Sequence, residues 1–181
     1  MGLRYIKYAL LAGLVAFTGA TRSHAQSKAQ QQSLNDGYSQ FYSFCGQEKN
    51  LSLLNFVKTT TPEIADYEKR ISETATRDMA ILTKFAANTQ ALRLDTVSLS
   101  SFETSVRHSM DADREHRLIF GASGAAYSEA VLMTQCEATN YGLHVAKILS
   151  QIDPNSDRAA AMNRIFEHWS KLHEESYRLN K

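Results

Sequence analysis

The chain has 181 residues, with 20 basic and 19 acidic side chains and a formal net charge of +1. This balance argues against a nucleic-acid-binding or anionic-membrane-binding surface, which needs a concentrated basic face. The sequence has only two prolines and eight glycines, a composition that favours long helices over turn-rich β structure.

The N-terminal segment has the order of features found in secretory signal peptides. Two basic residues precede an apolar run from Ala9 to about Ala20, and small residues follow at the two positions that a signal peptidase recognises. We therefore predict that residues 1–25 are a signal peptide, cleaved between Ala25 and Gln26. The apolar run is shorter than the ~20 residues of a membrane-spanning helix. We expect a periplasmic or secreted protein with no integral membrane segment after processing.

The mature chain begins with a polar tract and continues as helices. Residues 26–32 lack apolar periodicity, which indicates a flexible leader. The aromatic and apolar residues that follow fit a helix of about 25 residues from about Ser33. Thr61 and Pro62 then supply an N-cap and a first-turn proline for a second helix that runs to about Leu92.

Three more helices complete the prediction. Ser100 and Glu103 have the spacing of a capping box at the start of a helix that ends near Phe120. After two glycines, a long helix from Ala125 to Ile152 carries a continuous apolar stripe, and a last helix follows the Asp-Pro turn at 153–154. The stripe consists of Tyr127, Val131, Thr134, Ala138, Tyr141, Val145, Ile148 and Ile152.

Five helical segments with short connections predict a single all-α domain over residues 33–181. The simplest arrangement is an antiparallel helical bundle in which four helices enclose the core and the fifth packs outside. The helix from Ala125 to Ile152 is the centre of this arrangement, because its stripe has to be buried against the other helices.

The second helix is similar to a known family at its apolar positions. The sequence of this helix resembles, without gaps, the bacterial ferritin-like exported family called domain of unknown function 4142. It departs from the family at Thr74 and Ala75, where members usually carry an Asp-His pair. The third helix is similar more loosely, at Phe102, Val106 and Met110. The resemblance implies an exported ferritin-like four-helix bundle with an additional helix, and it implies no activity. The matching positions in the second helix are Pro62, Glu63, Ile64, Tyr67, Ile71, Leu82, Phe85 and Ala86.

The sequence lacks the familiar catalytic motifs. It has no Gly-x-Ser-x-Gly elbow, phosphate-binding Gly-Lys-Ser/Thr loop, His-Glu-x-x-His pair or Cys-x-x-Cys-His haem site. We therefore expect a non-enzymatic protein that acts through contacts with a protein partner in the cell envelope. The aromatic residues of the first helix leave open an alternative function, as a carrier of a small apolar ligand.

A degenerate ferritin-like metal site is the other alternative. Asp113 and His116 have acid-x-x-His spacing on an apolar stripe, and in di-iron bundles such pairs converge on one metal. Glu48, Glu137 and His144 could complete a cluster with them. A full di-iron site needs two such motifs and two further carboxylates, so we expect no cofactor, with a single weakly bound transition metal as the alternative. A hydrogen bond between Asp113 and His116, with Glu137 and His144 at a wet helix edge, explains the same residues without a metal. The stripe consists of Phe102, Val106, Ser109, Asp113, His116 and Phe120.

The chain has two cysteines, Cys45 and Cys136. Each lies near the middle of a predicted helix, and an exported protein meets an oxidising compartment. We therefore predict a disulfide between them if the two helices are neighbours. Two free buried thiols are the alternative.

Overall fold

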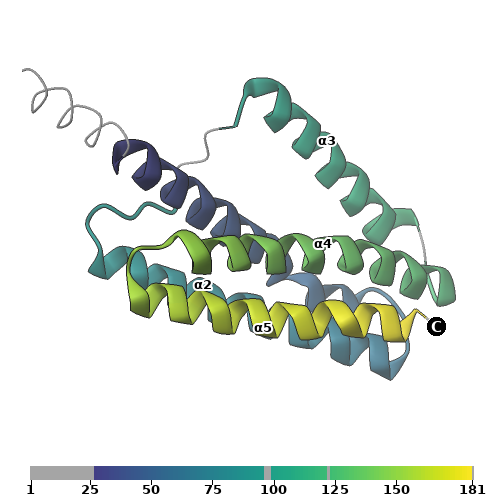
Figure 1. Cartoon of the computed structure of the whole chain (residues 1–181). Coiled ribbons are helices and arrows are strands. Elements are labelled where there is room, and N and C mark those ends of the chain that lie inside the picture. Colours follow the sequence, from purple (N-terminus) through teal and green to yellow (C-terminus); the bar gives the residue numbers. More distant parts are fainter. Residues whose placement is uncertain (1–26, 96–98, 122, 181) are drawn as a thin grey trace, which may run out of the picture.

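The computed structural model describes residues 27–95, 99–121 and 123–180, and every regular element within these ranges is a helix (Figure 1). The prediction of an all-α fold is confirmed. The predicted signal peptide and its cleavage site lie outside the described residues. None of the described helices is both long and apolar enough to cross a bilayer.

The N-terminal helix spans residues 27–48 and is followed by a short 3-10 helix, η1 (Leu51–Phe56). The helix therefore includes most of the tract in which the sequence predicts a flexible leader. Side chains one turn apart support it there, because Gln32 donates to Asp36 at 2.9 Å and Ser33 donates to the carbonyl of Ala29 at 3.0 Å. The predicted end near residue 57 is also too late, since the α-helix stops at residue 48.

Two helices begin where the capping residues in the sequence predict. Helix α2 (Pro62–Asn88) begins after Thr61, whose hydroxyl accepts a hydrogen bond from the Ile64 amide at 3.4 Å. Helix α3 (Ser101–His116) begins after Ser100, whose hydroxyl accepts from the Glu103 amide at 3.1 Å. A π-helical turn, η2 (Arg117–Gly121), continues α3.

The C-terminal half is a hairpin of two long helices. Helix α4 (Ala125–Ile152) and helix α5 (Ser156–Leu179) lie side by side and antiparallel (Figure 1). Asn155 caps α5 by accepting from the Arg158 amide at 2.9 Å. The carboxylate of Asp153 accepts from the Asn155 amide and from the Arg158 guanidinium, which fixes the turn between the two helices.

Hydrogen bonds between distant segments show the direction of α2. The Tyr67 hydroxyl donates to the Leu172 carbonyl at 3.0 Å, and the Arg158 guanidinium donates to the Thr89 hydroxyl at 3.2 Å. Residues early in α2 therefore lie beside residues late in α5, so the two helices are antiparallel. Since α5 is antiparallel to α4 as well, α2 and α4 run in the same direction.

The N-terminal helix is antiparallel to α2. The Gln31 amide donates to the Ala91 carbonyl at 3.0 Å near one end, and the Ser72 hydroxyl donates to the Glu48 carbonyl at 3.3 Å near the other. The N-terminal helix, α2, α4 and α5 supply most of the buried apolar side chains. At the centre the Trp169 indole packs against the ring of Phe44, with centroids 4.7 Å apart and an interplanar angle of 61°.

The buried face of α4 differs from the predicted stripe. Ile148 and Ile152, two members of the stripe, are 54% and 37% exposed. Polar Gln135 and Thr139 lie inside instead, and so does Gly142. Because apolar residues surround much of this helix, their spacing alone does not select the face that is buried. The buried positions are Tyr127, Val131, Leu132, Gln135, Thr139, Gly142, Leu143, Ala146 and Leu149.

The predicted core stripe of α3 is also wrong. None of the residues of α3 is buried, and Phe102 and Met110 are 77% and 63% exposed. The side of α3 that meets the bundle is polar. Arg114 donates to Glu48 at 2.7 Å, and the Arg107 guanidinium lies 5.9 Å from the centre of the Tyr141 ring. These cationic contacts hold α3 with its apolar side chains turned away from the core.

Candidate functional site

The residues proposed as metal ligands do not form one site. Glu48 is completely buried, whereas Asp113, His116, Glu137 and His144 are exposed on α3 and α4. No group of three His, Cys, Asp or Glu side chains is placed to hold a metal ion anywhere in the described part of the chain. The pairing of Asp113 with His116 is replaced by local contacts, because Asp113 accepts from Arg117 at 3.0 Å and His116 packs near Phe120.

The predicted disulfide is wrong, because Cys45 and Cys136 are free and lie apart. The rotated face of α4 explains this result. Gln135 takes the central core position, which leaves the neighbouring Cys136 half-buried on the side facing Tyr177 of α5. Cys45 is fully buried in the N-terminal helix. Burial and the nearby carboxylates of Asp78 and Glu48 raise the pKa of its thiol well above its usual range.

Besides Asp153 in the turn between α4 and α5, three carboxylates are buried inside the bundle, each with a specific partner. Glu68 accepts from the Tyr127 hydroxyl at 2.7 Å, and Asp78 accepts from the Trp169 indole at 2.9 Å. Burial raises the pKa of Glu68 and that of Asp78 above their ordinary values, although these hydrogen bonds oppose the shift. The third carboxylate, Glu48, is bonded to Arg114 of α3 through one oxygen.

Several atoms of this polar core have no hydrogen-bond partner among the residues that the structure describes. They are Oε2 of Glu48, Oε2 of Glu68 and both amide atoms of Gln135. Buried polar groups are normally hydrogen-bonded, and a buried group without a hydrogen bond costs about 1–3 kcal/mol of stability. The unmade hydrogen bonds therefore make this interior less stable than a core in which every polar group is satisfied.

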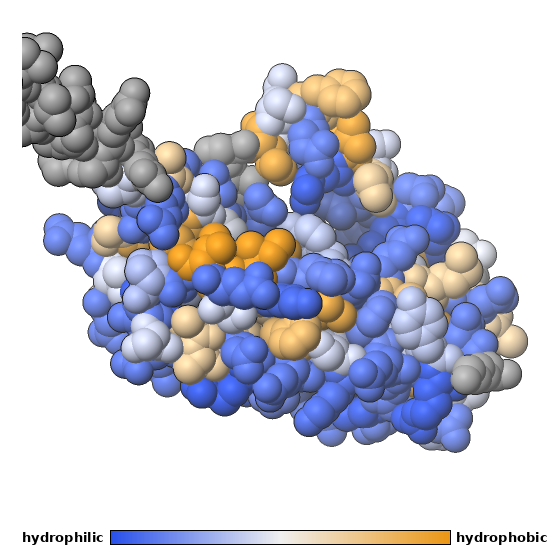
Figure 2. All heavy atoms as spheres, viewed as in Figure 1, coloured by the Kyte–Doolittle hydropathy of each residue, from blue (hydrophilic) through white to orange (hydrophobic). Residues whose placement is uncertain are grey.

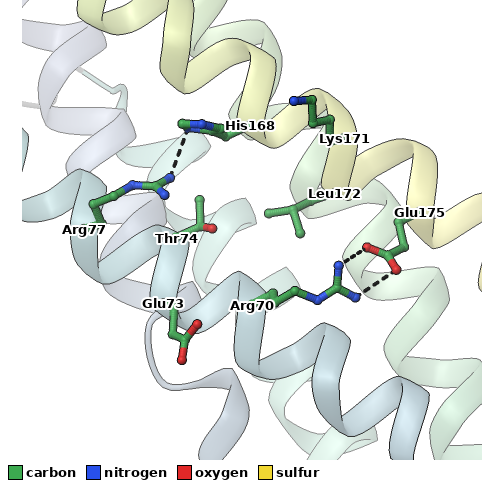
Figure 3. Close-up of a pocket in the computed structure, with 8 residues that line it drawn as sticks. All are labelled: Arg70, Glu73, Thr74, Arg77, His168, Lys171, Leu172 and Glu175. Atoms are coloured by element: carbon green, nitrogen blue, oxygen red, sulfur yellow. Dashed lines mark hydrogen bonds and ion pairs between the residues drawn. The ribbon is translucent and has the colours of Figure 1, made fainter.

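A surface groove of about 440 Å³ lies between α2 and α5 (Figure 3). We call it the α2–α5 groove. Thr74 and Leu172 lie between its two ends. Its lining residues are Arg70, Glu73, Thr74, Arg77, His168, Lys171, Leu172 and Glu175.

One end of the α2–α5 groove is neutralised by ion pairs. Arg70 makes two hydrogen bonds to the carboxylate of Glu175, one of 2.8 Å to Oε1, and also donates to Asp66 at 2.9 Å. The Arg70 guanidinium lowers the pKa of Glu175, which also accepts from Arg178. The charges at this end are therefore already matched within the protein.

The other end presents basic side chains from both helices. Arg77 donates through Nε to Asp78 at 3.2 Å, and its Nη2 lies 3.2 Å from Nδ1 of His168. Lys171 makes no ion pair or hydrogen bond through its ammonium group with the residues that the structure describes. Arg77 is paired with Asp78, so this end of the groove concentrates hydrogen-bond donors, and Lys171 adds a cation that has no carboxylate partner among the described residues.

Sequence reasoning missed the α2–α5 groove. The five-residue separation of His168 and His173 predicts two solvent-side histidines. His168 is exposed, as predicted, and contacts Arg77, whereas His173 is half-buried and contacts the Thr139 hydroxyl at 3.1 Å. A usable pattern was present, because Arg70, Thr74 and Arg77 follow one another at steps of four and three along one side of α2. The partner row on α5 could not be matched to it without the helix directions.

A second exposed surface lies on α3. Phe102, Val106 and Met110 follow one another at steps of four, and they are 77%, 37% and 63% exposed. We call these three side chains the α3 face. Figure 2 shows apolar side chains on α3 where it stands away from the rest of the bundle.

Comparison of the chain with known protein families, with curated proteins and with solved structures finds no significant match. The resemblance to the domain of unknown function 4142 family therefore stays a prediction. The function has to be argued from the two surfaces and the polar core.

Proposed function

We propose that this chain is an exported, non-enzymatic helical bundle that binds a protein partner in the cell envelope through the α3 face. The observation that carries the proposal is that α3 buries none of its residues while Phe102 and Met110 remain largely exposed. Contiguous apolar side chains on a protein surface mark interaction sites. The order of features at the N-terminus supports export.

The partner that suits this surface has an apolar groove wide enough for one helix. Helices that dock into such grooves present apolar anchors about one turn apart, as Phe102, Val106 and Met110 do. Arg107 and Arg114 hold α3 against the bundle through their contacts with Tyr141 and Glu48. The α3 face is therefore presented in a fixed orientation, which lowers the entropy lost on binding.

The directions of the other helices support the further proposal that the bundle is ferritin-like. Because α2 and α4 run the same way, the connection between them has to pass along the bundle, as in bundles with one long crossover. Helix α3 lies in that connection. In this proposal α3 is both the crossover and the binding element, and the function requires no cofactor.

Site-specific photo-crosslinking in the native cells tests the proposal. A photoreactive amino acid replaces Met110 in the α3 face, and the matched control carries it at Ala112, which is exposed on the other side of α3. We expect a discrete crosslink to another protein from position 110 and none from position 112. A Phe102→Asp substitution should remove the crosslink without changing the melting curve, because surface substitutions usually change stability by less than about 0.5 kcal/mol.

The same experiment separates the other possible occupants. Crosslinks only between two copies of the chain, accompanied by a dimer mass in solution, would show that the α3 face mediates self-association and does not bind another protein. Crosslinks only to lipid would show that the α3 face binds a membrane surface and not a protein. Equal crosslinking from positions 110 and 112 would show that the α3 face has no special role, and each of these results overturns the proposal.

A further inference from the structure

We infer that the α2–α5 groove binds a small ligand carrying one oxyanion group, a phosphate or a carboxylate, at the end formed by Arg77, His168 and Lys171. This site is separate from the α3 face, so the inference does not depend on the proposed function. It is carried by the convergence of three basic side chains from two helices on one groove of about 440 Å³ (Figure 3).

Arg77 is held in place by the core of the protein. Its Nε donates to Asp78, whose carboxylate is completely buried and also accepts from the Trp169 indole at 2.9 Å. A guanidinium has five N–H donors in a rigid plane. One is used by Asp78 and one by His168, so three remain for a ligand, and the fixed plane suits the two oxygens of a carboxylate or phosphate.

His168 and Lys171 complete this end of the groove. Because a guanidinium can only donate, Nδ1 of His168 is the acceptor of the 3.2 Å contact with Arg77. His168 therefore helps to fix the direction of the Arg77 guanidinium. Lys171 stands one turn along α5 from His168, and its ammonium group has no partner among the described residues (Figure 3). An oxyanion at this end would meet the guanidinium of Arg77 and the ammonium group of Lys171.

The rest of the groove limits the ligand to one anionic group. At the far end Glu73 and Glu175 present carboxylates, and Arg70 is already matched by Glu175. A second anionic group would be repelled there, which excludes polyanions such as nucleic acids. Thr74 and Leu172, which lie between the ends, provide a hydroxyl and an apolar contact for the body of a small molecule.

Chemical-shift titration of the isotope-labelled mature protein tests the inference. Inorganic phosphate and acetate are added separately, each up to about 20 mM, while chloride keeps the ionic strength constant. We expect saturable shifts of the backbone amides at 74–78 and 168–172. Lys171→Gln should weaken binding about fivefold, because an ion pair between exposed groups contributes at most about this much to affinity. The matched control is Lys84→Gln, which removes the same charge from an exposed position of α2 outside the groove and should leave affinity unchanged.

Each outcome decides the inference. Saturable shifts with phosphate alone assign a phosphate site, those with acetate alone assign a carboxylate site, and those with both assign a general oxyanion site. Linear shifts with both anions, or equal weakening by Lys171→Gln and Lys84→Gln, would overturn the inference. Lys171 is exposed, so the fold of its variant should be intact, and circular dichroism checks this.

Discussion

The ring of Phe44 occupies the space that a side chain at Gly142 would need. A Cβ atom at position 142 would lie 2.5 Å from Cε1 and 2.6 Å from Cζ of Phe44. The ring cannot easily move, because it also packs against Trp169 and Tyr141, with centroids 4.7 and 5.8 Å away. The glycine in the middle of α4 therefore allows the N-terminal helix to approach closely.

Gly142→Ala should destabilise the protein by roughly 1–3 kcal/mol, the usual cost of overpacking a core. Gly46→Ala is the matched control, because its Cβ would meet only Cε of Met79 at 4.0 Å. Alanine in a helix is favoured over glycine, so this control should stabilise by about 0.5–1 kcal/mol. Urea unfolding followed by circular dichroism measures both values. Effects of the same sign at positions 46 and 142 would contradict the packing described for Phe44.

How much of the fold could be predicted from the sequence depended on the kind of pattern. Local rules worked at Thr61 and Ser100, because these residues cap helices by contacts within three residues. The prediction of the buried face of α4 was wrong. That face depends on Gly142, which leaves space for the ring of Phe44, a residue almost 100 positions earlier. Such a contact leaves no periodic trace in the sequence of either helix.

Glu68→Gln should stabilise the protein at pH 7 by on the order of 1 kcal/mol. Glutamine keeps the oxygen that accepts from Tyr127 and removes a buried charge. Because burial raises the pKa of Glu68, the folded state binds its proton more tightly than the unfolded state, and the wild type gains stability as pH falls toward the unfolded value of about 4.3. The advantage of the variant should therefore shrink over that range.

Thermal unfolding at a series of pH values measures this difference. Glu73→Gln is the control, because Glu73 is exposed on the same helix and should change stability by less than about 0.5 kcal/mol. An advantage of Glu68→Gln that is the same at pH 7 and pH 4.5 would show that the charge of Glu68 is not the cause.

Asp153→Asn should destabilise the protein by about 3 kcal/mol, because it leaves Arg158 without its buried counter-charge. The Asp153 carboxylate accepts from Tyr38 at 2.7 Å, from Arg158 at 2.7 and 2.8 Å, and from the Asn155 amide at 2.8 Å. Burial alone would raise the pKa of Asp153, but these hydrogen bonds outweigh it and lower the value.

The sign of the pH dependence follows from that lowered pKa. The stability from Asp153 is fully present above its unfolded pKa of about 3.9 and is lost as pH falls through the folded value. The gap between wild type and Asp153→Asn should therefore narrow below about pH 4. Urea unfolding from pH 3 to pH 7 measures it, and a gap that widens in acid would contradict the network around Arg158.

The candidate sites were less predictable than the fold. Glu48 is in the core, but its partner Arg114 comes from α3, whose apolar stripe the sequence wrongly predicts to be buried. The groove between α2 and α5 needs the pairing of Arg77 with His168 across 91 positions. Surface contacts of this kind follow from helix directions and not from hydrophobic periodicity.

The two thiols should differ in reactivity in the native protein. Cys45 is completely buried and its pKa is raised, whereas Cys136 is half-buried. A thiol reagent should therefore modify Cys136 first, with Cys45 reacting at least about 100-fold more slowly, since it requires opening of the bundle. Mass spectrometry of partly labelled protein locates the modification. After unfolding without a reducing agent, both thiols should react, and a single reactive thiol or none would contradict the separation of the cysteines.

The last prediction concerns metal content. Protein purified without chelator or affinity histidines should contain less than about 0.1 transition-metal ion per chain, because the residues that could bind one are distributed over the core and two exposed faces. Asp113 is paired with Arg117, and Glu48 with Arg114, so binding would first have to break an ion pair.

Elemental analysis of the wild type and of a His116→Ala variant measures this prediction. The two proteins should give the same low value, because the exposed His116 packs near Phe120 and lies in no group of ligands. A value of about one zinc, iron or copper per chain that falls in His116→Ala would require Asp113 to leave Arg117 and join His116 on one ion. That result would make the metal-binding alternative the better account of this protein.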